Sequence, residues 1–365
     1  MRLLSSVLAA FVLAGVAQAA DPLQTSAGQV RIDEMVSGLD APWAIAHLPD
    51  GGFLVTERSG DLIHVAGGKK ARVKGVPKVV ARGQGGLLDI TLPRDFAQSR
   101  EVFLTFSKKM QGGAGTALAV GRLSADSSRL QDVRVIFEAS EGSSGGRHFG
   151  SRVVEAEDGT LFVTIGDRGD RPSAQDASNH NGTIVRINRD GTVPADNPFV
   201  GREGVRPEVW SYGHRNPQGA GLDLQGRLWT SEHGAQGGDE VNLIRKGANY
   251  GWPVISYGRH YSGAKIGEGT AKDGMAQPEH YWDPSIAPSG LMVYSGKLWP
   301  DWRGDIFVGS LKFDYISRLA GRDMREVEQI EGQSTSRVRD IVEAPDGSIW
   351  FISVGDGAVY RMTPG

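Results

Sequence analysis

The sequence contains no cysteine. Disulfide bonds, thiolate metal sites and a cysteine nucleophile are therefore excluded as sources of stability or of chemistry. We expect the fold to be held together by packing, with a bound ion as a possible further contribution.

Long apolar runs are missing beyond the first residues of the chain. Leu3 to Val16 is apolar, follows the positively charged Arg2 and precedes the small-residue sequence Ala17-Gln18-Ala19. This is the pattern of a cleaved secretory signal peptide, because the run is short for a bilayer span and polar residues follow at once. We predict that residues 1–19 are a signal peptide and that the mature protein, residues 20–365, is periplasmic. A retained membrane anchor is the alternative, and we do not favour it.

Blocks of like charge are also missing, and the formal net charge of the 365 residues is −3. Nucleic acid is therefore not an expected partner. We expect a monomer or a weak homo-oligomer.

Glycine, in contrast, is abundant. The chain has 51 glycines together with 8 tryptophans and 8 tyrosines, and glycine is about twice as frequent as in an average protein. Sustained helical periodicity is almost absent. This combination is typical of many short strands joined by tight turns.

One short pattern recurs along the chain. It is a turn dipeptide with glycine followed by a β-branched or aromatic run, and an apolar segment precedes each copy, as expected of a β-hairpin. The four copies are Asp50–Thr56, Asp158–Thr164, Gln225–Thr230 and Asp346–Phe351. Two weaker copies pair Leu87–Leu92 with Val102–Phe106, and Leu291–Tyr294 with Asp305–Leu311.

Six such units, spaced by roughly 45 to 70 residues, match the blades of a propeller. We therefore predict an all-β protein with a single domain, a six-bladed β-propeller, because a β-sandwich does not easily contain six similar units. A strand near Val30–Val36 is expected to pair with a strand near Gly357–Met362 and close the ring. Loops from all blades meet at one mouth of the axial channel, so residues far apart in sequence can form one site.

The densest group of polar residues lies between Ser211 and Pro253. Arg215 and Asn216 stand between Gly213 and Pro217, so both side chains are expected on a bent loop. Such loops carry ligand chemistry in many proteins, although the glycines alone would suit ordinary hairpin turns.

Other candidate site residues follow or precede the predicted strands. Each has an ordinary alternative, because a lone histidine often lies at a polar rim, an aspartate often forms a turn and basic residues are usually solvated. Alternation would place Arg337 and Arg339 on one face of a strand, and such a cationic face needs an anion. The candidates are Gln84, His148, Asp167, Gly234, Ala235, Asp239, Glu240, Tyr261, Lys312, Arg337 and Arg339.

From Trp43 to Met362 the chain resembles the soluble quinoprotein aldose sugar dehydrogenases and, more distantly, soluble glucose dehydrogenase that uses pyrroloquinoline quinone (PQQ). The matching motifs are G-H-R-N-P-Q-G (213–219), S-E-H-G-A-Q-G-G-D-E-V-N-L-I (231–244) and N-Y-G-W-P (249–253). The spacing of His148 and Asp167 also agrees. The resemblance implies a six-bladed propeller that binds PQQ and calcium near the channel mouth and oxidises the C1 hydroxyl of aldoses to lactones.

The resemblance also implies roles for individual residues. His148 would be the general base, oriented by Asp167, while Arg215 and Asn216 would hold the reactive carbonyl edge of the quinone, with Gln84 at the reaction centre. The residues implied to bind the body and carboxylates of PQQ are Tyr261, Lys312, Arg337 and Arg339. The carbonyls of Gly234 and Ala235 would ligate the cofactor calcium, and Glu240 with the main chain of Tyr250 would ligate a second calcium. Lysine and arginine suit a planar tricarboxylate, and calcium prefers such oxygen ligands.

Some positions depart from the family pattern. Arg147 precedes the implied base, where the glucose enzyme has an acidic residue that contacts the sugar, and Ala235 stands where relatives often have proline. The segment between Gly258 and Asp283 is also shorter. We expect a broad aldose preference, and the electron acceptor is unknown.

Two other classes of function are compatible with a propeller. A calcium-dependent lactonase or other hydrolase would use a metal-bound water, would need a carboxylate-rich axial site and would have no use for Lys312, Arg337 and Arg339. A non-enzymatic propeller that binds a glycan or a peptide would not require His148.

Overall fold

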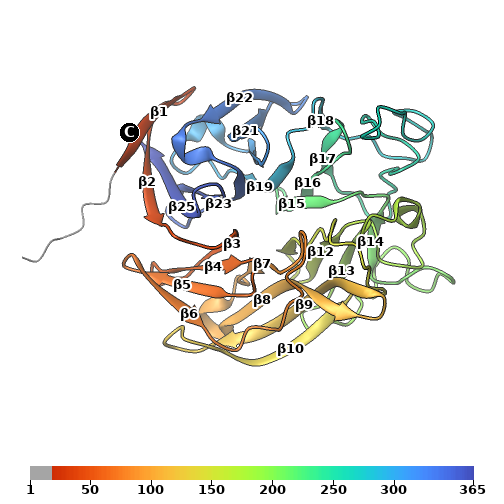
Figure 1. Ribbon diagram of the computed structural model, residues 1–365, viewed down its shortest axis with the longest axis horizontal. Helices are drawn as coiled ribbons and strands as arrows, with labels where there is room; N and C mark the ends of the chain where they lie inside the picture. The colour runs from red at the N-terminus through yellow and green to blue at the C-terminus, as the bar shows by residue number, and fades with distance from the viewer. Residues whose placement is uncertain (1–18) are drawn as a thin grey trace, which may run out of the picture.

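The computed structural model describes residues 19–365, and it consists of six antiparallel β-sheets arranged in a ring (Figure 1). The predicted signal peptide lies outside the described residues, apart from Ala19. The prediction of a six-bladed β-propeller is confirmed.

Each of the first five blades is built from four consecutive strands. The first strand of each blade lies innermost. The first two blades contain β3 (Pro42–His47), β4 (Phe53–Glu57), β5 (Leu62–Ala66) and β6 (Lys69–Val73), then β7 (Leu87–Thr91), β8 (Glu101–Met110), β9 (Gly113–Leu123) and β10 (Leu130–Glu138). The third and fourth contain β11 (Val153–Glu155), β12 (Leu161–Ile165), β13 (Thr183–Ile187) and β14 (Val209–Tyr212), then β15 (Pro217–Leu222), β16 (Leu228–Glu232), β17 (Asp239–Leu243) and β18 (His280–Trp282). The fifth contains β19 (Pro288–Val293), β20 (Ile306–Ser310), β21 (Tyr315–Ala320) and β22 (Arg325–Glu331).

The sixth blade contains β23 (Val338–Glu343), β24 (Ile349–Ser353) and β25 (Ala358–Pro364), and it is completed by β1 (Ala19–Thr25) and β2 (Gly28–Val36) from the other end of the chain. β2 pairs with β25 in antiparallel register, with Val30 opposite Pro364 and Val36 opposite Val359. The predicted closure of the ring is therefore confirmed.

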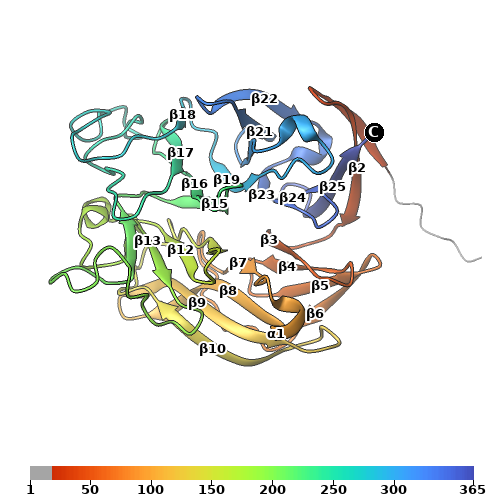
Figure 2. The ribbon, with the colours of Figure 1, turned by 180° about the vertical axis from the view of Figure 1, so that it is seen from behind.

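The innermost strands β3, β7, β11, β15, β19 and β23 contact one another in sequence around the axis, and β23 returns to β3. Figure 2 shows the same ring from behind. The short helix α1 (Phe96–Ser99) is part of the connection from β7 to β8. Three short 3-10 helices, η1 (Arg171–Gln175), η2 (Pro300–Trp302) and η3 (Gln333–Thr335), lie in connections. No helix among residues 19–365 is long and apolar enough to cross a membrane.

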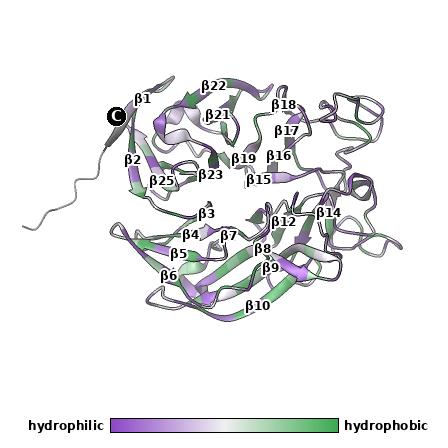
Figure 3. Ribbon diagram, in the orientation of Figure 1, coloured by the Kyte–Doolittle hydropathy of each residue, from purple (hydrophilic) through white to green (hydrophobic). Residues whose placement is uncertain are grey.

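Burial explains why the strands have these sequences. β4, β12, β16, β20 and β24 are buried along their whole length, because neighbouring blades cover both faces of the sheet. The outermost strands have many exposed residues, as in β6 and β22. Figure 3 shows the hydrophobic residues concentrated in strands such as β5 and β8.

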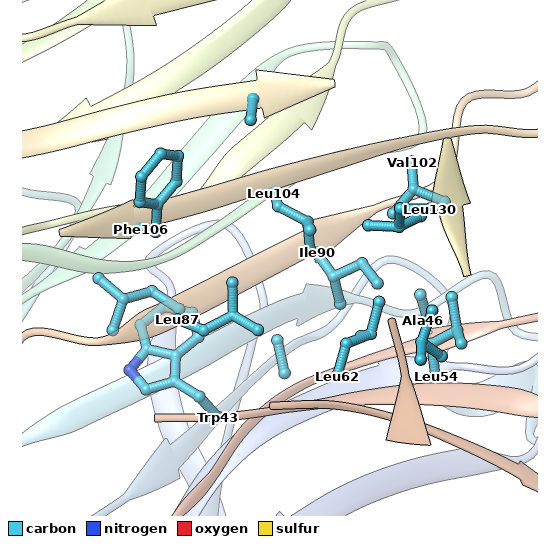
Figure 4. Packing of buried hydrophobic residues seen from close by; sticks show 14 of the residues in the cluster. Trp43, Ala46, Leu54, Leu62, Leu87, Ile90, Val102, Leu104, Phe106 and Leu130 are labelled. Atoms are coloured by element: carbon cyan, nitrogen blue, oxygen red, sulfur yellow. The ribbon is translucent and has the colours of Figure 1, made fainter. Parts of the chain in front are cut away.

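Side chains from adjacent blades pack together to form the core. Between the first two blades, Trp43 and Leu62 lie close to Leu87, Ile90 and other buried residues (Figure 4). Burying apolar surface of this kind contributes about 25 cal/mol per Å². The packing between blades therefore fixes the relative positions of the loops at the channel mouth.

The recurring turn has the backbone that the sequence predicts. Its glycine has a φ of 86° at Gly51, 82° at Gly159, 74° at Gly226 and 88° at Gly347. These values lie in the left-handed region that glycine adopts without steric cost.

Candidate active site

A cavity of about 740 Å³ lies at one mouth of the propeller. Several residues that line it begin an innermost strand, as Trp43 and Gln218 do, or follow the end of the next strand, as Arg58 and Lys312 do. Antiparallel hairpins place these two positions at the same edge of a sheet, so segments of five blades meet around one space.

Four cationic side chains line this cavity: Arg58, Lys312, Arg337 and Arg339. The lining contains one carboxylate, that of Asp283. Burial, together with the charges of Arg152, Arg337 and Arg58, lowers the pKa of Arg339 to about 9. The cavity therefore has an excess of positive charge that an anionic ligand would neutralise.

Hydrogen bonds to neutral groups hold two of these cations in place. Arg339 Nη1 donates to Oε1 of Gln218 at 2.9 Å, and Arg337 Nη1 donates to the carbonyl of Leu311 at 2.8 Å. Neither bond offsets the positive charge of the guanidinium groups, so both remain available to bind an anion.

The structure places His148 and Asp167 in direct contact. Nδ1 of His148 lies 2.6 Å from Oδ1 of Asp167. Asp167 follows β12 and is fully buried, and its carboxylate also accepts hydrogen bonds from the indole of Trp252 at 2.8 Å and from the main chain of Gly169 at 2.7 Å. The carboxylate is thus fixed, and it fixes the imidazole.

Electrostatics define the protonation states of this pair. Burial lowers the pKa of His148; the hydrogen bond to Asp167 opposes this effect, while the charge of Arg215 adds to it. Burial raises the pKa of Asp167, but the hydrogen bonds from His148 and Gly169 and the charge of Arg215 act against burial, and the pKa is lowered overall. Near pH 7 we therefore assign a neutral imidazole that donates from Nδ1 and leaves Nε2 free to accept a proton.

Arg215 and Asn216 lie on the loop between β14 and β15 and are buried. Arg215 Nη1 donates to the carbonyl of His233 at 3.1 Å, whereas Arg215 Nε and Asn216 Nδ2 have no hydrogen-bond partner within residues 19–365. An unsatisfied buried donor costs roughly 1–3 kcal/mol. Two such donors side by side in the chain indicate that a ligand supplies the missing acceptors.

These four residues lie beside the large cavity, and two lining residues connect them to it. The main chain of His148 donates to Oε1 of Gln84 at 2.7 Å. The second link is His233, whose pKa is lowered to about 3, chiefly by burial and by the charges of Arg215 and Arg339. The predicted base and the predicted anion-binding residues therefore surround the same region.

The structure brings seven of the sequence-predicted residues together around the cavity: Gln84, Gly234, Ala235, Tyr261, Lys312, Arg337 and Arg339. Tyr261 is 75% exposed, at the rim.

Arg337 and Arg339 do not lie on one face of a strand, so that prediction is wrong. Arg337 precedes β23 and has a φ of 52°, and its main chain donates to Oδ1 of Asp314 at 2.8 Å. This turn, rather than strand alternation, directs Arg337 to the cavity.

Glu240 and Tyr250 line a second cavity of about 10 Å³ together with Glu232, and this cavity shares His233 and Gly234 with the large one. Burial and the charge of Glu232 raise the pKa of Glu240 to about 8. The hydroxyl of Tyr250 donates to the carbonyl of Leu243 at 2.6 Å, so only its main chain remains to serve as a ligand. Two carboxylates around a space of this size would suit a cation.

The loop from Gly234 to Asp239 is held by Asp239 rather than by an ion pair. Oδ1 of Asp239 accepts a hydrogen bond from the main chain of Gly234 at 2.7 Å, and Oδ2 accepts from Ser285 at 2.6 Å. Within residues 19–365 no group of three or more histidine, aspartate or glutamate side chains could hold a metal ion. A cation at the large cavity would therefore need main-chain carbonyls such as those of Gly234 and Ala235.

Sequence reasoning missed several residues of the site. Arg58, Gln218 and His233 line the large cavity, and Trp252 supports Asp167. His233 and Trp252 lie inside the motifs quoted above, and their position there was the available signal. Arg58 had no local signal, because its place depends on how the first blade packs against the second.

A six-bladed propeller with a cationic axial cavity and a carboxylate-held histidine beside it is the architecture of an enzyme that binds an anionic ligand. The chain belongs to the glucose/sorbosone dehydrogenase family, which it matches over residues 39–361.

Known relatives agree with this assignment. The chain is 42% identical to the aldose sugar dehydrogenase YliI of Escherichia coli over 92% of its own length and 93% of that protein. The crystal structure of the soluble aldose sugar dehydrogenase from Escherichia coli in the apo-form superposes with a TM-score of 0.89 at 42% identity, covering 92% of this chain and 100% of that one. The PQQ-bound aldose sugar dehydrogenase of Streptomyces coelicolor superposes with a TM-score of 0.76 at 26% identity, covering 94% and 99%.

Proposed function

We propose that the protein is a PQQ-dependent aldose sugar dehydrogenase that oxidises the C1 hydroxyl of aldoses to lactones. The observation that carries this proposal is the cavity with four cations and a single carboxylate, next to a neutral histidine held by a buried aspartate. Its family membership and the PQQ-bound relative support the same conclusion.

The residues of the cavity fit PQQ. PQQ is a planar tricarboxylate, and Lys312, Arg337 and Arg339 would bind its carboxylates through charge-assisted hydrogen bonds. Tyr261 would contact the body of the cofactor at the rim. The unsatisfied donors Arg215 Nε and Asn216 Nδ2 would meet acceptor oxygens of the quinone. A cavity of about 740 Å³ lies in the range of cofactor and substrate sites.

Calcium fits two places. The carbonyls of Gly234 and Ala235, at the wall of the large cavity, would hold an ion next to the cofactor. Glu240 and the main chain of Tyr250 would hold a second ion in the small cavity, where it would neutralise a carboxylate that is otherwise costly to ionise. Both donor sets consist of the oxygen ligands that calcium prefers.

The chain would contribute proton transfer and electrostatic stabilisation. Nε2 of His148 would accept the proton of the C1 hydroxyl, while Asp167 would keep the imidazole in the required tautomer and stabilise its positive charge. Arg215 would stabilise negative charge that develops beside His148, and Gln84 would hold the main chain of His148. When bound, PQQ supplies the chemistry that the side chains lack, by accepting the hydrogen and two electrons lost from C1.

The two rival functions have less support. A hydrolase would have no need for Lys312, Arg337 and Arg339, and a carboxylate-rich metal site is absent from residues 19–365. A glycan-binding propeller gives no reason for the His148–Asp167 pair. We further propose that residues 20–365 form one catalytic domain, that residues 1–19 direct the protein to the periplasm, and that an acceptor still to be identified removes the electrons.

Reconstitution tests the proposed function. Apoprotein incubated with PQQ and Ca²⁺ should reduce an artificial dye when aldoses are added, and samples without PQQ or treated with a calcium chelator should not. His148→Ala should retain PQQ but lose about 10²–10⁴-fold in turnover, the usual contribution of a general base. Hydrolysis of lactones without PQQ, or normal turnover in His148→Ala, would contradict the proposal.

A further inference from the structure

A second group of buried polar residues lies behind Arg215, and the mechanism above does not use it. It consists of Ser211, His214 and Glu232, which are 0%, 0% and 4% exposed. Ser211 Oγ lies 2.9 Å from Nε2 of His214, and Nδ1 of His214 lies 2.9 Å from Oε1 of Glu232. The order of groups is that of a serine–histidine–carboxylate triad, but no substrate can reach a fully buried Ser211. The group therefore has another role.

Glu232 is the centre of this group because its carboxylate accepts three hydrogen bonds. Oε1 accepts from His214 and from Nδ2 of Asn242, both at 2.9 Å, and Oε2 accepts from the main-chain N–H of Arg215 at 2.8 Å. A carboxylate satisfied by three donors in a buried site has a single orientation. Glu232 thus fixes the point where the chain turns toward the unsatisfied donors of Arg215 and Asn216.

The peptide of Arg215 continues this connection to the histidine. Its carbonyl accepts a hydrogen bond from the main chain of Asp167 at 2.8 Å, and the carboxylate of Asp167 holds Nδ1 of His148 at 2.6 Å. One buried carboxylate therefore holds the Arg215 main chain, which in turn contacts the main chain of the residue that orients His148.

Glu232 also lines the small cavity that contains Glu240 and Tyr250. The ring of Tyr250 stacks on His214, with centroids 4.5 Å apart and an angle of 23° between the rings. Arg215 lines this cavity as well, so Glu232 and the Arg215 loop meet at its wall.

We propose that Glu232 is a positioning residue for sugar oxidation, whose buried carboxylate holds the Arg215 main chain and so keeps Arg215 and the Asp167–His148 pair aligned. The proposal rests on the proposed function for the reaction that is aligned, whereas the structural link itself does not. A misplacement of about 1 Å in an active site can reduce the rate by about 10²-fold.

Glu232→Gln tests this proposal, because the amide has the same shape but cannot accept all three hydrogen bonds. The matched control is Glu155→Gln: the Glu155 side chain is 8% exposed and accepts a main-chain hydrogen bond from Arg94 at 2.8 Å, and this last residue of β11 lines neither cavity. We expect kcat of Glu232→Gln to fall by about 10–100-fold with little change in the KM for aldose. Glu155→Gln should resemble the wild type.

Two further measurements separate positioning from a general loss of stability. Arg215 lowers the pKa of His148, so movement of Arg215 away from His148 should shift the acid limb of the pH–rate profile to higher pH in Glu232→Gln. Loss of the negative charge alone would shift it to lower pH. In the apoprotein, hydrogen exchange of the Arg215 amide should be at least about 10-fold faster in Glu232→Gln than in wild type, because its acceptor is weakened.

A wild-type kcat in folded Glu232→Gln, an acid limb that is unchanged or lower, or an unchanged exchange rate at Arg215 would each overturn the proposal. If Glu232→Gln does not fold, Glu232→Asp, which keeps the charge but shortens the side chain, is judged by kcat and the exchange rate. If the wild type itself shows no activity with PQQ, the proposed function fails, and the exchange comparison still decides whether Glu232 holds the Arg215 loop.

Discussion

At the scale of single residues, the site depends on how burial and neighbouring charges act on a few side chains. Burial disfavours the protonated form of His148, and Asp167 counters this effect by accepting a hydrogen bond from the ring. In Arg339, by contrast, burial and adjacent guanidinium groups act in the same direction and lower its pKa to about 9. The result is a neutral base beside positive charges that only a ligand can compensate.

The lowered pKa of His148 predicts the pH dependence of turnover. Only the neutral imidazole can accept a proton, so activity is lost as pH falls through the pKa of His148, and we expect the acid limb of kcat/KM below the ordinary value of 6.5. Asp167→Asn removes the group that raises this pKa, so its acid limb should lie lower still. Its kcat should fall by about 10²–10⁴-fold, because the ring loses its orientation.

The control for this prediction is Asp190→Asn, at an exposed turn where the carboxylate accepts hydrogen bonds from Thr192. It should leave the profile unchanged. An acid limb that moves to higher pH in Asp167→Asn would show that Asp167 does not act on His148 in this way.

At the scale of elements, most of the fold could be predicted from the sequence. The repeated turn and its β-branched or aromatic runs located the hairpins of four blades, and two weaker pairs of apolar runs located those of the other two, because each is a local pattern in the sequence. The strand that closes the ring was also predictable, since both ends of the chain are strand-like.

Contacts between distant elements were not predictable in the same way. Glu232 holds Arg215, and Arg58 joins three other cations at the cavity, but each contact joins residues with no common local pattern. The site residues that sequence analysis did find came from the motifs of the family rather than from periodicity. Arg337 is an example. Strand alternation correctly placed it near Arg339, but Arg337 lies in a turn before β23 and not in the strand.

At the scale of the whole molecule, a buried ionic network connects blades across the axis. Nη1 of Arg152 lies 2.9 Å from Asp89 and 2.8 Å from Asp340, which belong to other blades, and its guanidinium lies 4.3 Å from the centre of the Trp43 ring. Arg152 Nε also donates to the carbonyl of Gln218 at 2.7 Å. This network therefore lies next to the cavity and links the residues that line it.

Replacing Arg152 should destabilise the propeller. Arg152→Met leaves two buried carboxylates without a cation, so we expect the free energy of unfolding to fall by about 3–5 kcal/mol. Burial already raises the pKa of Asp89 to about 6 despite Arg152. Protonation relieves the buried charge, so the loss should be smaller at pH 5 than at pH 8. Urea unfolding at both values measures it.

Arg31→Met is the control, because the Arg31–Asp33 pair is exposed and such pairs contribute about 0–1 kcal/mol. Equal stability of Arg152→Met and Arg31→Met would contradict a stabilising role for the axial network.

Titration of PQQ into the calcium-loaded apoprotein shows whether the cations of the large cavity bind this cofactor. This assignment predicts saturable binding of one PQQ per chain, and a Kd weakened by about 10-fold or more in Lys312→Ala, which removes a charge-assisted hydrogen bond. Lys69→Ala, on the exposed outer strand β6, should bind as the wild type does. Failure of the wild type to bind PQQ, or equal binding by Lys312→Ala, would contradict it.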